Sequence, residues 1–391
     1  MKLLLVCDDT IVCCKGKYYY PRQERLEFYQ RYLRVFENLR LCARVEFETE
    51  LKAGRIPIEA EPRLDYLPLP GFQGPKQYVG KYFSVGRVLR KAVVGCDAAV
   101  LRLPSTVAQR AYKPVKKSGM PYAVEVVFDS YDGFKTATKP FLKGLYFIIY
   151  KQLVTACNHA DGVSCVTEHY LQQRYYSKKP NAFTSHYSSL SLDLSFYTAP
   201  RQYPVSKQFV IAHTAKQVMF NGRKGHNELI NAVRLLKDEG IIVNVRFAGE
   251  DYNGGIEKLK AYSEEQGVAK QIEFVGFLSR KELDGFLNDA DLYVMPTKAE
   301  GLPRVIIEAM AKGLPCISTP VSGNPELLPE HYLVAYDDVR LLAERIKELV
   351  TDKAEYEKAS SDNYNNSLKY EAHKLQAMRD EFYLCLKKTL G

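Results

Sequence analysis

Residues 291–319, DLYVMPTKAEGLPRVIIEAMAKGLPCIST, decide the fold. The apolar run 291–295 predicts a buried strand, and Pro303 stands where a helix would begin, a position that tolerates the missing N–H of proline. Apolar residues then repeat at helical spacing as far as Gly313, the expected left-handed cap, and a second strand begins at Cys316. Two strands joined by one helix over about 30 residues are typical of a parallel crossover unit.

Two carboxylates mark this unit as a candidate binding site. Glu300 lies in the loop before the predicted helix and Glu308 lies on the helix, with seven residues between them. A helix N-terminus carries free N–H groups and the positive end of the helix dipole, so it attracts phosphate. A carboxylate beside a phosphate needs donors from another group, and sugar hydroxyls supply them. Each glutamate by itself is more simply explained as a solvated helix charge, so the assignment rests on the whole string.

The string 300–303 (EGLP), followed by 308–311 (EAMA) and 313–315 (GLP), resembles the donor-site signature of retaining glycosyltransferases of the GT-B fold. That large Glu-x(7)-Glu family includes sucrose synthases and bacterial mannosyltransferases. The resemblance implies an α/β protein with two Rossmann-like domains facing a cleft. It also implies that Glu300 holds hydroxyls of the donor sugar, that Glu308 holds the ribose, and that backbone N–H groups near residues 301–304 face the diphosphate.

Bulk properties limit the class of protein. The length of 391 residues favours two or three domains. No apolar run approaches the roughly 18 residues that span a bilayer, and Asp8 and Asp9 follow the apolar start so closely that we expect a buried strand there and not a signal peptide. The nine cysteines lack zinc-site spacing, so we expect reduced cytosolic thiols and no metal site. The formal charge of +9 suits polyanions or anionic membranes, but no nucleic-acid motif is present.

Residues 1–200 are expected to form an acceptor-side Rossmann-like domain. A first strand over 2–7 is followed by a loop, and a helix is predicted over 24–41. Asp129 follows a predicted strand over 122–127. Many members of the similar family have a His-Asp pair here, and this chain has Phe128 in place of the histidine. Asp129 is therefore a candidate for positioning the sugar or the acceptor, and a structural turn aspartate is an equal alternative.

The segment 135–157 combines lysines with large apolar residues. A basic, aromatic amphipathic segment can lie on an anionic membrane surface. A core-facing helix with ordinary surface lysines is the favoured alternative, because a two-domain enzyme needs such helices. The lysines are Lys135, Lys139, Lys143 and Lys151.

A second Rossmann-like domain, which binds the donor, is expected over 205–355, after a linker at 196–208. Strands and helices alternate regularly there, which favours a parallel sheet covered on both faces. Ser279 is the expected N-cap of a helix over 280–288. Ligands of such sheets bind at the carboxyl ends of the strands. Residues 356–391 are expected to be helical and to cross back to the first domain, as the resemblance implies.

The loop after the first strand of this domain carries the candidate phosphate cations. Lys224 with Gly225 matches the Lys-Gly pair of the similar family, whose arginine is not in its usual place here. Lys216 is the preferred substitute and Arg223 is its rival. A lysine is a point charge and not a bidentate fork, so the replacement of the family's arginine by Lys216 is imperfect.

The resemblance implies a retaining glycosyltransferase that moves a sugar from a UDP- or GDP-sugar to a glycan or lipid-linked acceptor, in bacterial capsular, exopolysaccharide or lipopolysaccharide synthesis. No cofactor and no metal are expected, and the location is cytoplasmic, with an anionic membrane surface as a further partner. A sugar-nucleotide epimerase or hydrolase and a non-catalytic basic polyanion-binding protein are the alternatives. The catalytic candidates are Lys216, Lys224, Glu300 and Asp129; the donor-binding candidates are Glu308, Gly301, Leu302, Pro303, Gly249, Glu250, Gly276, Phe277 and Thr297.

Overall fold

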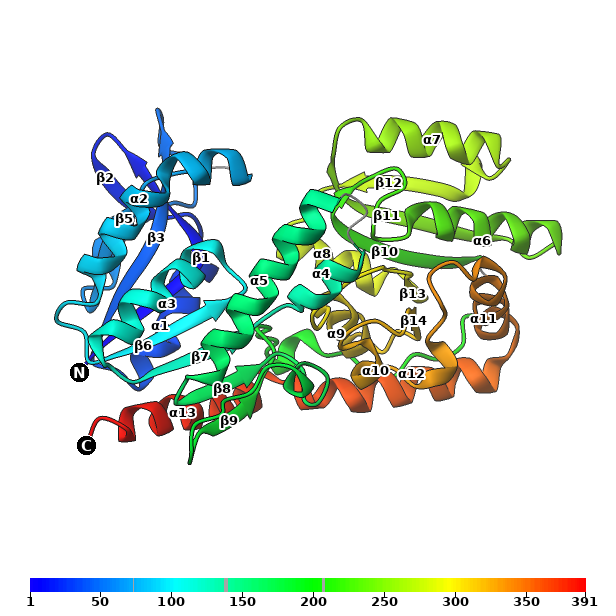
Figure 1. The fold of residues 1–391 in the computed structure, drawn as a ribbon. Coiled ribbons are helices and arrows are strands. Elements are labelled where there is room, and N and C mark those ends of the chain that lie inside the picture. Colours follow the sequence, from blue (N-terminus) through cyan, green and yellow to red (C-terminus); the bar gives the residue numbers. More distant parts are fainter. Residues whose placement is uncertain (73, 137–139, 206–207) are drawn as a thin grey trace. The chain divides into compact units, whose positions relative to one another are not determined.

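The computed structural model describes residues 1–72, 74–136, 140–205 and 208–391 (Figure 1). The chain forms two compact units. Unit 1 comprises Met1–Tyr187 and Gln376–Gly391, and unit 2 comprises Ser188–Leu375. Each unit has its own sheet with flanking helices, which confirms the predicted α/β class with two Rossmann-like sheets. The chain passes between the units at Ser188, ahead of the linker expected at 196–208, and residues 206–207 of that linker lie outside the described residues.

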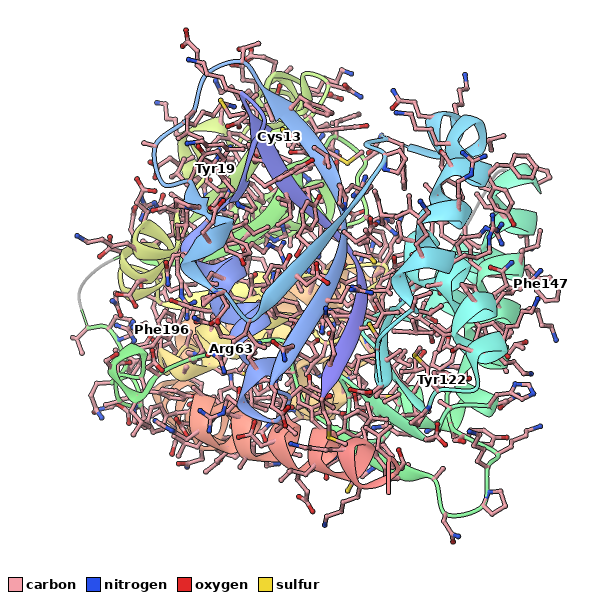
Figure 2. All side chains as sticks on the ribbon, turned by 90° about the vertical axis from the view of Figure 1, so that its left-hand side faces the viewer. Cys13, Tyr19, Arg63, Tyr122, Phe147 and Phe196 are labelled. Atoms are coloured by element: carbon pink, nitrogen blue, oxygen red, sulfur yellow. The ribbon has the colours of Figure 1, made fainter. Side chains whose placement is uncertain are left out.

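The sheet of unit 1 is built around β1 (Lys2–Cys14), which is longer than the predicted strand over 2–7. Its start pairs parallel with β6 (Ala98–Leu103), and its end pairs antiparallel with β2 (Lys17–Tyr20). A register shift between Val6 and Thr10 separates the two pairings, as expected for a bulge that re-aims a strand. Cys13 of β1 and Tyr19 of β2 are labelled in Figure 2. The expected loop is therefore a continuation of the strand.

The helix predicted over 24–41 is only partly correct. A helix, α1, spans Gln23–Gln30, but β3 begins at Asn38 and runs to Glu48. The apolar residues of 39–43 pair with β1 on one side and with β5 on the other, so sheet burial overrides the helical spacing. The remaining elements of unit 1 are β4 (Ile56–Pro57), β5 (Leu64–Leu69), β7 (Tyr122–Val126), β8 (Gly162–Cys165), β9 (Phe183–His186), α2 (Gly74–Ala92), α3 (Thr106–Ser118), α4 (Ser130–Thr136) and α5 (Pro140–Asn158).

The C-terminal helix, α13 (Ala372–Lys388), enters unit 1 at Gln376 and packs there through a buried carboxylate, Glu125 of β7. Arg102 Nη1 lies 2.7 Å from Glu125 Oε2. The hydroxyls of three tyrosines also donate to Glu125: Tyr32, Tyr187 and Tyr383. Burial acts to raise the pKa of Glu125, but Arg102 and the three hydroxyls outweigh it and lower that pKa below the usual value. Glu125 therefore stays ionised and joins α13 to the sheet.

Unit 2 has a five-stranded parallel sheet in the order β12-β11-β10-β13-β14. From β10 the chain builds the sheet outward through β11 to β12, and then returns to the opposite side of β10 as β13. The direction of strand order thus reverses between β10 and β13, which is where ligands of such sheets bind. The elements are β10 (Phe209–Val218), α6 (His226–Asp238), β11 (Val243–Asp251), α7 (Gly255–Glu265), β12 (Ile272–Gly276), α8 (Arg280–Asn288), β13 (Leu292–Met295), α9 (Arg304–Ala311), β14 (Cys316–Ser318), α10 (Asn324–Leu327), α11 (Val339–Thr351) and α12 (Lys353–Ser367).

Local predictions for unit 2 have mixed outcomes. The N-cap at Ser279 is confirmed: its hydroxyl accepts from the N–H of Glu282, whose carboxylate accepts from the N–H of Ser279. Gly313 has a left-handed φ of 68° at the end of α9, as predicted. Lys216, which was expected in the loop after the first strand, instead lies on β10, which continues to Val218 with a register shift between Thr214 and Gln217. Among the described residues, no helix has the length and apolarity needed to cross a bilayer.

Candidate active site

The candidate site lies in unit 2 at the carboxyl ends of β10 and β13. The loop 219–225 connects β10 to α6, and the loop 296–303 connects β13 to α9. Both loops follow strands that flank the reversal of strand order, so the sheet topology itself brings them together.

An ion pair between Lys224 and Glu300 joins the two loops. Lys224 Nζ contacts Glu300 Oε1, and Thr297 Oγ1 donates to the same oxygen over 3.1 Å. Thr297 is fully buried, whereas the Lys224 side chain is 30% exposed. Among the residues that the structure describes, no group donates to Glu300 Oε2. The structure thus brings three of the predicted site residues into contact and leaves one carboxylate oxygen and the outer face of the ammonium group for a ligand.

Backbone contacts fix this arrangement. Lys298 N donates to the carbonyl of Arg223 over 2.8 Å, and Thr297 Oγ1 lies 3.2 Å from the same carbonyl. Gly225 has a φ of 74°, and a Cβ at this position would lie 1.9 Å from the carbonyl oxygen of Pro296. Only glycine combines this conformation with so close an approach. Gly225 therefore places Lys224 within reach of Glu300.

The N-terminus of α9 opens into the same region. Pro303 is the N-cap residue and contributes no side-chain cap, so the first N–H groups of α9 are available to an anion. Gly301 and Leu302 are buried, and the carbonyl of Gly301 accepts from Gly323 N over 2.9 Å. The neighbouring Ser322 has a φ of 48°, and its Oγ is buried without a hydrogen-bond partner in the described part of the chain. The sequence analysis missed Ser322, because a lone serine after a strand carries no motif signal.

Glu308 lies on α9 and is largely enclosed. Its carboxylate forms no hydrogen bond or ion pair with a described residue, although Arg304 and Arg280 are near enough to influence it. Burial raises the pKa of Glu308 to about 7, and the two arginines oppose that rise. A partly buried acceptor that the described residues leave unsatisfied is suited to a ligand that brings its own hydroxyl donors.

The other donor-binding candidates lie along the same edge of the sheet. Gly249 and Glu250 lie near the end of β11, and a Cβ on Gly249 would lie 2.3 Å from the carbonyl oxygen of Ala215, so Gly249 serves the packing of the bulge in β10. Gly276 ends β12, and the following Phe277 is 54% exposed. These residues border the site but do not contact the ion pair of Lys224.

The two candidates for the second cation, Lys216 and Arg223, are both exposed. Lys216 lies on the bulged part of β10, and Arg223 directly precedes Lys224. Neither side chain forms an ion pair with a described residue. Both remain available to an anion, so the choice between them remains a prediction.

The catalytic expectation for Asp129 is not supported by its surroundings. Asp129 is 0% exposed in unit 1. Its Oδ1 accepts from Tyr175 OH over 2.6 Å and from the N–H of Tyr131, and its Oδ2 lies 2.9 Å from Arg174 Nη1. Both oxygens are thus occupied by neighbouring residues. These contacts favour the structural role that the sequence analysis kept as its alternative, and the catalytic role of Asp129 stays a prediction.

Two histidines beneath the site also escaped the sequence analysis. His213 and His226 are fully buried, their ring centroids are 4.7 Å apart, and both pack against Phe247. Burial lowers the pKa of His226 to about 4, and burial together with His226 lowers that of His213. Both rings are therefore neutral at pH 7 and act as core residues that support the loop 219–225.

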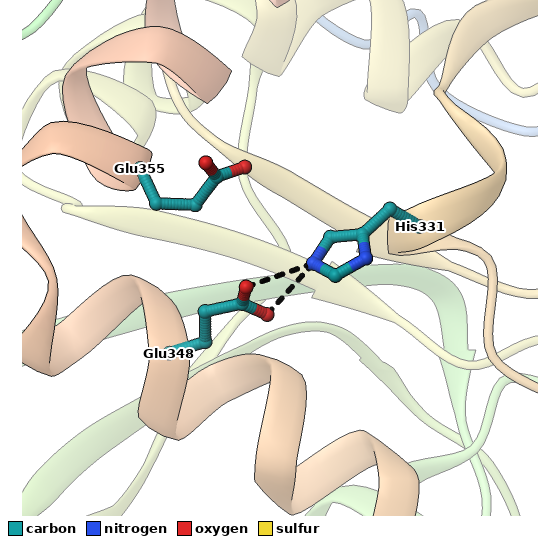
Figure 3. Close-up of side chains that lie close together, drawn as sticks. All are labelled: His331, Glu348 and Glu355. Atoms are coloured by element: carbon teal, nitrogen blue, oxygen red, sulfur yellow. Dashed lines mark hydrogen bonds and ion pairs between the residues drawn. The ribbon is translucent and has the colours of Figure 1, made fainter.

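A separate cluster in unit 2 has the composition of a metal site. Ligand atoms of His331, Glu348 and Glu355 lie within 4.8 Å of one another (Figure 3). However, Glu348 Oε2 also pairs with Arg345, and the carboxylate of Glu355 lies 3.5 Å from Lys358 Nζ. The carboxylates already have cationic partners, so the cluster is explained as an ion-pair network at the surface.

Part of unit 2 is similar in sequence to glycosyltransferases. Residues 209–366 match the family model of glycosyl transferases group 1. Protein CapJ of Staphylococcus aureus is 24% identical over 393 aligned positions, which cover 100% of this chain and 97% of that protein. A putative colanic acid biosynthesis glycosyltransferase, WcaL of Escherichia coli (strain K12), is 33% identical over 133 positions, which cover 32% of each chain. The residues that match the family model all lie within unit 2.

Comparisons of structure show the GT-B fold. The chain is similar to sucrose-phosphate synthase from Thermosynechococcus elongatus, with a TM-score of 0.72, 16% identity and 99% of both chains covered. It is also similar to HepE of Anabaena in complex with UDP-glucose, with a TM-score of 0.65, 15% identity, and 97% and 98% of the two chains covered. The predicted GT-B fold is thereby confirmed.

The substitution Gly225→Ala tests whether the close approach of the two loops builds the site. We expect it to weaken the binding of a nucleoside diphosphate by at least about tenfold, because a Cβ displaces Lys224 from Glu300. Gly240→Ala is the matched control. Gly240 has a φ of 80° but no atom within 4 Å of its Cβ position, so it bears only the conformational cost of about 1 kcal/mol. Calorimetric titration that gives equal affinities for the two variants would refute this account.

Glu308 makes ligand binding depend on pH. Hydroxyls that donate to Glu308 favour its ionised form, so binding of a nucleoside diphosphate should release the proton that Glu308 retains below a pKa of about 7. Between pH 6 and pH 8 the wild-type affinity should rise by up to about tenfold relative to that of Glu308→Gln. The titration of the phosphate itself is common to both proteins and cancels in the ratio. A ratio that does not change with pH would remove Glu308 from the site.

The pH dependence of the stability of the unliganded protein is an independent test of the raised pKa of Glu308. The pKa of Glu308 is higher in the folded protein than its usual 4.5, so the folded state binds the additional proton between pH 4.5 and about pH 7. The contribution of Glu308 to stability is therefore present below that range and is lost as the pH rises through it. Glu308→Gln should become more stable than the wild type as the pH rises from 5 to 8, as measured by thermal unfolding.

Proposed function

We propose that this protein is a retaining glycosyltransferase that moves a sugar from a nucleoside-diphosphate sugar to an acceptor hydroxyl in the synthesis of a bacterial surface polysaccharide. The contact among Lys224, Glu300 and Thr297 beside the N-terminus of α9 carries this proposal. It places a cation, free backbone donors and an unfilled carboxylate oxygen within one short stretch of the sheet edge. A nucleoside-diphosphate sugar offers complementary groups, namely a diphosphate and sugar hydroxyls.

Lys224 is assigned to the leaving diphosphate. Negative charge grows on the diphosphate as the bond between sugar and phosphate breaks, and a preorganised cation stabilises that growing charge. The ammonium group has three donors. One of them contacts Glu300, so the others can reach phosphate oxygens while Glu300 keeps the side chain in place. The first N–H groups of α9 add to this stabilisation.

The two glutamates are assigned to hydroxyl groups of the donor. Glu300 Oε1 is occupied by Lys224 and Thr297, and Oε2 is left for a hydroxyl of the sugar. Glu308 accepts from the ribose, where its unsatisfied carboxylate gains donors. The complex of the similar HepE with UDP-glucose supports a UDP-sugar as the donor. A glycan or polyprenol-linked acceptor is proposed from the resemblance to polysaccharide-assembling enzymes such as WcaL.

We propose that the enzyme attaches to the surface of a membrane through α5. Leu142, Phe147 and Ile148 of α5 are 37%, 42% and 54% exposed, and Phe147 is labelled in Figure 2. The ammonium groups of Lys143 and Lys151 lie 5.4 Å from the ring centroids of Phe134 and Phe147. Cations beside exposed aromatic rings suit the interface of an anionic membrane.

The substitution Lys224→Ala tests the catalytic assignment. We expect kcat to fall on the order of 100-fold to 1,000-fold, because the interaction strengthens in the transition state. Lys298→Ala is a control in the adjacent loop, since Lys298 is exposed and lies over the ring of Tyr336. An increase in KM with kcat unchanged would show that Lys224 only anchors the ground state. Of Lys216→Ala and Arg223→Ala, the variant that matches the kinetic effect of Lys224→Ala identifies the second cation.

Product analysis in the same assay separates the reaction classes. A glycosyltransferase consumes the donor only when an acceptor is present, and it keeps the anomeric configuration of the transferred sugar. An epimerase or a hydrolase converts the donor without an acceptor. A non-catalytic polyanion-binding protein shows no turnover and binds nucleic acid with a steep dependence on salt.

Vesicle binding tests the membrane proposal. Each surface lysine near an anionic membrane contributes about 1 kcal/mol. Changing Lys135, Lys139 and Lys143 to glutamine should therefore reduce binding to anionic vesicles, measured by sedimentation, on the order of 100-fold. Turnover of a soluble acceptor should be unchanged. Lys139 lies outside the described residues. Equal sedimentation of the variant and the wild type would favour a core-packing role for α5.

A further inference from the structure

A groove between α2 and α3 of unit 1 gathers four cationic side chains. Its volume is about 430 Å³, and Arg90, Arg110, Lys113 and Lys117 line it. None of its lining residues is acidic, and neither helix contains an aspartate or a glutamate. Within the described part of the chain, none of the four cations forms an ion pair. Four like charges in one groove repel one another unless an anion is bound among them.

The groove lies away from the edge of the sheet where substrates of α/β proteins bind. α2 connects β5 to β6, and α3 connects β6 to β7, so both helices run antiparallel to the strands. Tyr78 in the first turns of α2 donates to the carbonyl of Thr106 at the start of α3, which shows that the two helices run side by side in the same direction. The groove follows their later turns toward the amino ends of the strands. It is therefore separate from the carboxyl edge of this sheet.

Contacts with α2 fix the position of the Arg110 side chain in the groove. Its guanidinium carbon lies 4.2 Å from the ring centroid of Tyr82. A Cβ on Gly86 would lie 2.7 Å from Arg110 Nη2, so the glycine makes room for the guanidinium against α2. The Nε of Arg110 is buried and has no hydrogen-bond partner among the described residues. The protein thus orients this guanidinium without satisfying it.

The helix dipoles explain only part of this cluster. Arg90 and Lys117 lie in the last turns of α2 and α3, where cations compensate the partial negative charge of the free carbonyl groups. Arg110 lies in the second turn of α3, where the dipole disfavours a cation. Its position therefore calls for a different partner.

We propose that the α2–α3 groove binds a phosphate group, at a site separate from the donor site and independent of the proposed glycosyl transfer. The guanidinium of Arg110 offers planar, paired donors that match phosphate oxygens, and the lysines add point charges. Val79 and Phe83 of α2 are 72% and 80% exposed, so the same chemistry suits the headgroup of an anionic phospholipid as well as a soluble phosphate compound.

Two double variants of the full-length protein test this site. Arg90→Gln with Lys113→Gln removes two charges from the groove. Lys91→Gln with Lys116→Gln removes two charges from the same helices at residues that do not line it. Titration calorimetry with inorganic pyrophosphate forms one arm, and sedimentation with phosphatidylcholine vesicles that contain phosphatidylglycerol forms the other. Neither pair of substitutions lies in unit 2, so binding at the donor site cancels between the variants.

We expect the groove variant to lose at least about tenfold in affinity in one or both arms, and the control to stay within about twofold of the wild type. Loss in the pyrophosphate arm identifies soluble phosphate as a sufficient ligand, and loss confined to vesicles identifies the lipid headgroup. Gly86→Ala keeps the charge and favours the helix, so it should fold and still weaken binding several-fold by displacing Arg110. Equal binding by the two double variants in both arms would overturn the proposal.

Discussion

The contact between Lys224 and Glu300 is the interaction on which the candidate site of unit 2 depends. It joins the segments that follow β10 and β13, the two strands between which the order of the sheet reverses. A reversal of this kind leaves two loops diverging from one edge. In this protein the ion pair, together with the backbone contact at Gly225, draws them back together. The cation is thereby positioned before any ligand arrives, which is the condition for electrostatic stabilisation of a transition state.

Four carboxylates of the chain differ in how many of their oxygens have a hydrogen-bond or ion-pair partner within the protein. Glu125 and Asp129 have their oxygens occupied by an arginine and tyrosines, and each consolidates unit 1. Glu300 has one oxygen occupied, and Glu308 has neither. Burial raises the pKa of Glu308, whereas the pKa of Glu125 is lowered by the arginine and the tyrosines that satisfy it. The unsatisfied pair lies at the proposed donor site.

The sequence predicted unit 2 better than unit 1 for physical reasons. In unit 2 each strand and helix has one clear period, and Ser279 and Gly313 mark element ends with side-chain and backbone chemistry that is local. In unit 1 the segment 38–48 has apolar residues that suit either a helix or a strand, and only its pairing with β1 and β5 decides. The extension of β1 beyond its bulge has the same cause. Such choices depend on neighbours that are distant in the chain.

In the candidate site, too, some residues could be predicted from local sequence and others could not. Glu300 and Lys224 carry motif signals, and the structure places them in contact with each other and with Thr297. The satisfaction of Asp129 by Arg174 and Tyr175 could not be predicted, because those partners lie more than 40 residues away in the chain. Ser322 and the two core histidines, His213 and His226, likewise reveal their surroundings only in three dimensions.

The packing of α13 against unit 1 affects the order in which the two units can fold. Tyr383 donates to Glu125, a carboxylate near the middle of unit 1, so the charge buried in β7 receives its last donor from the end of the chain. Domains generally fold in the order of synthesis, the first one while the rest is still being translated. Unit 1 cannot complete its core in that way, because residues 376–391 are translated after unit 2. Unit 2 is contiguous in the chain and is complete before them, so the domain that is made first is finished second.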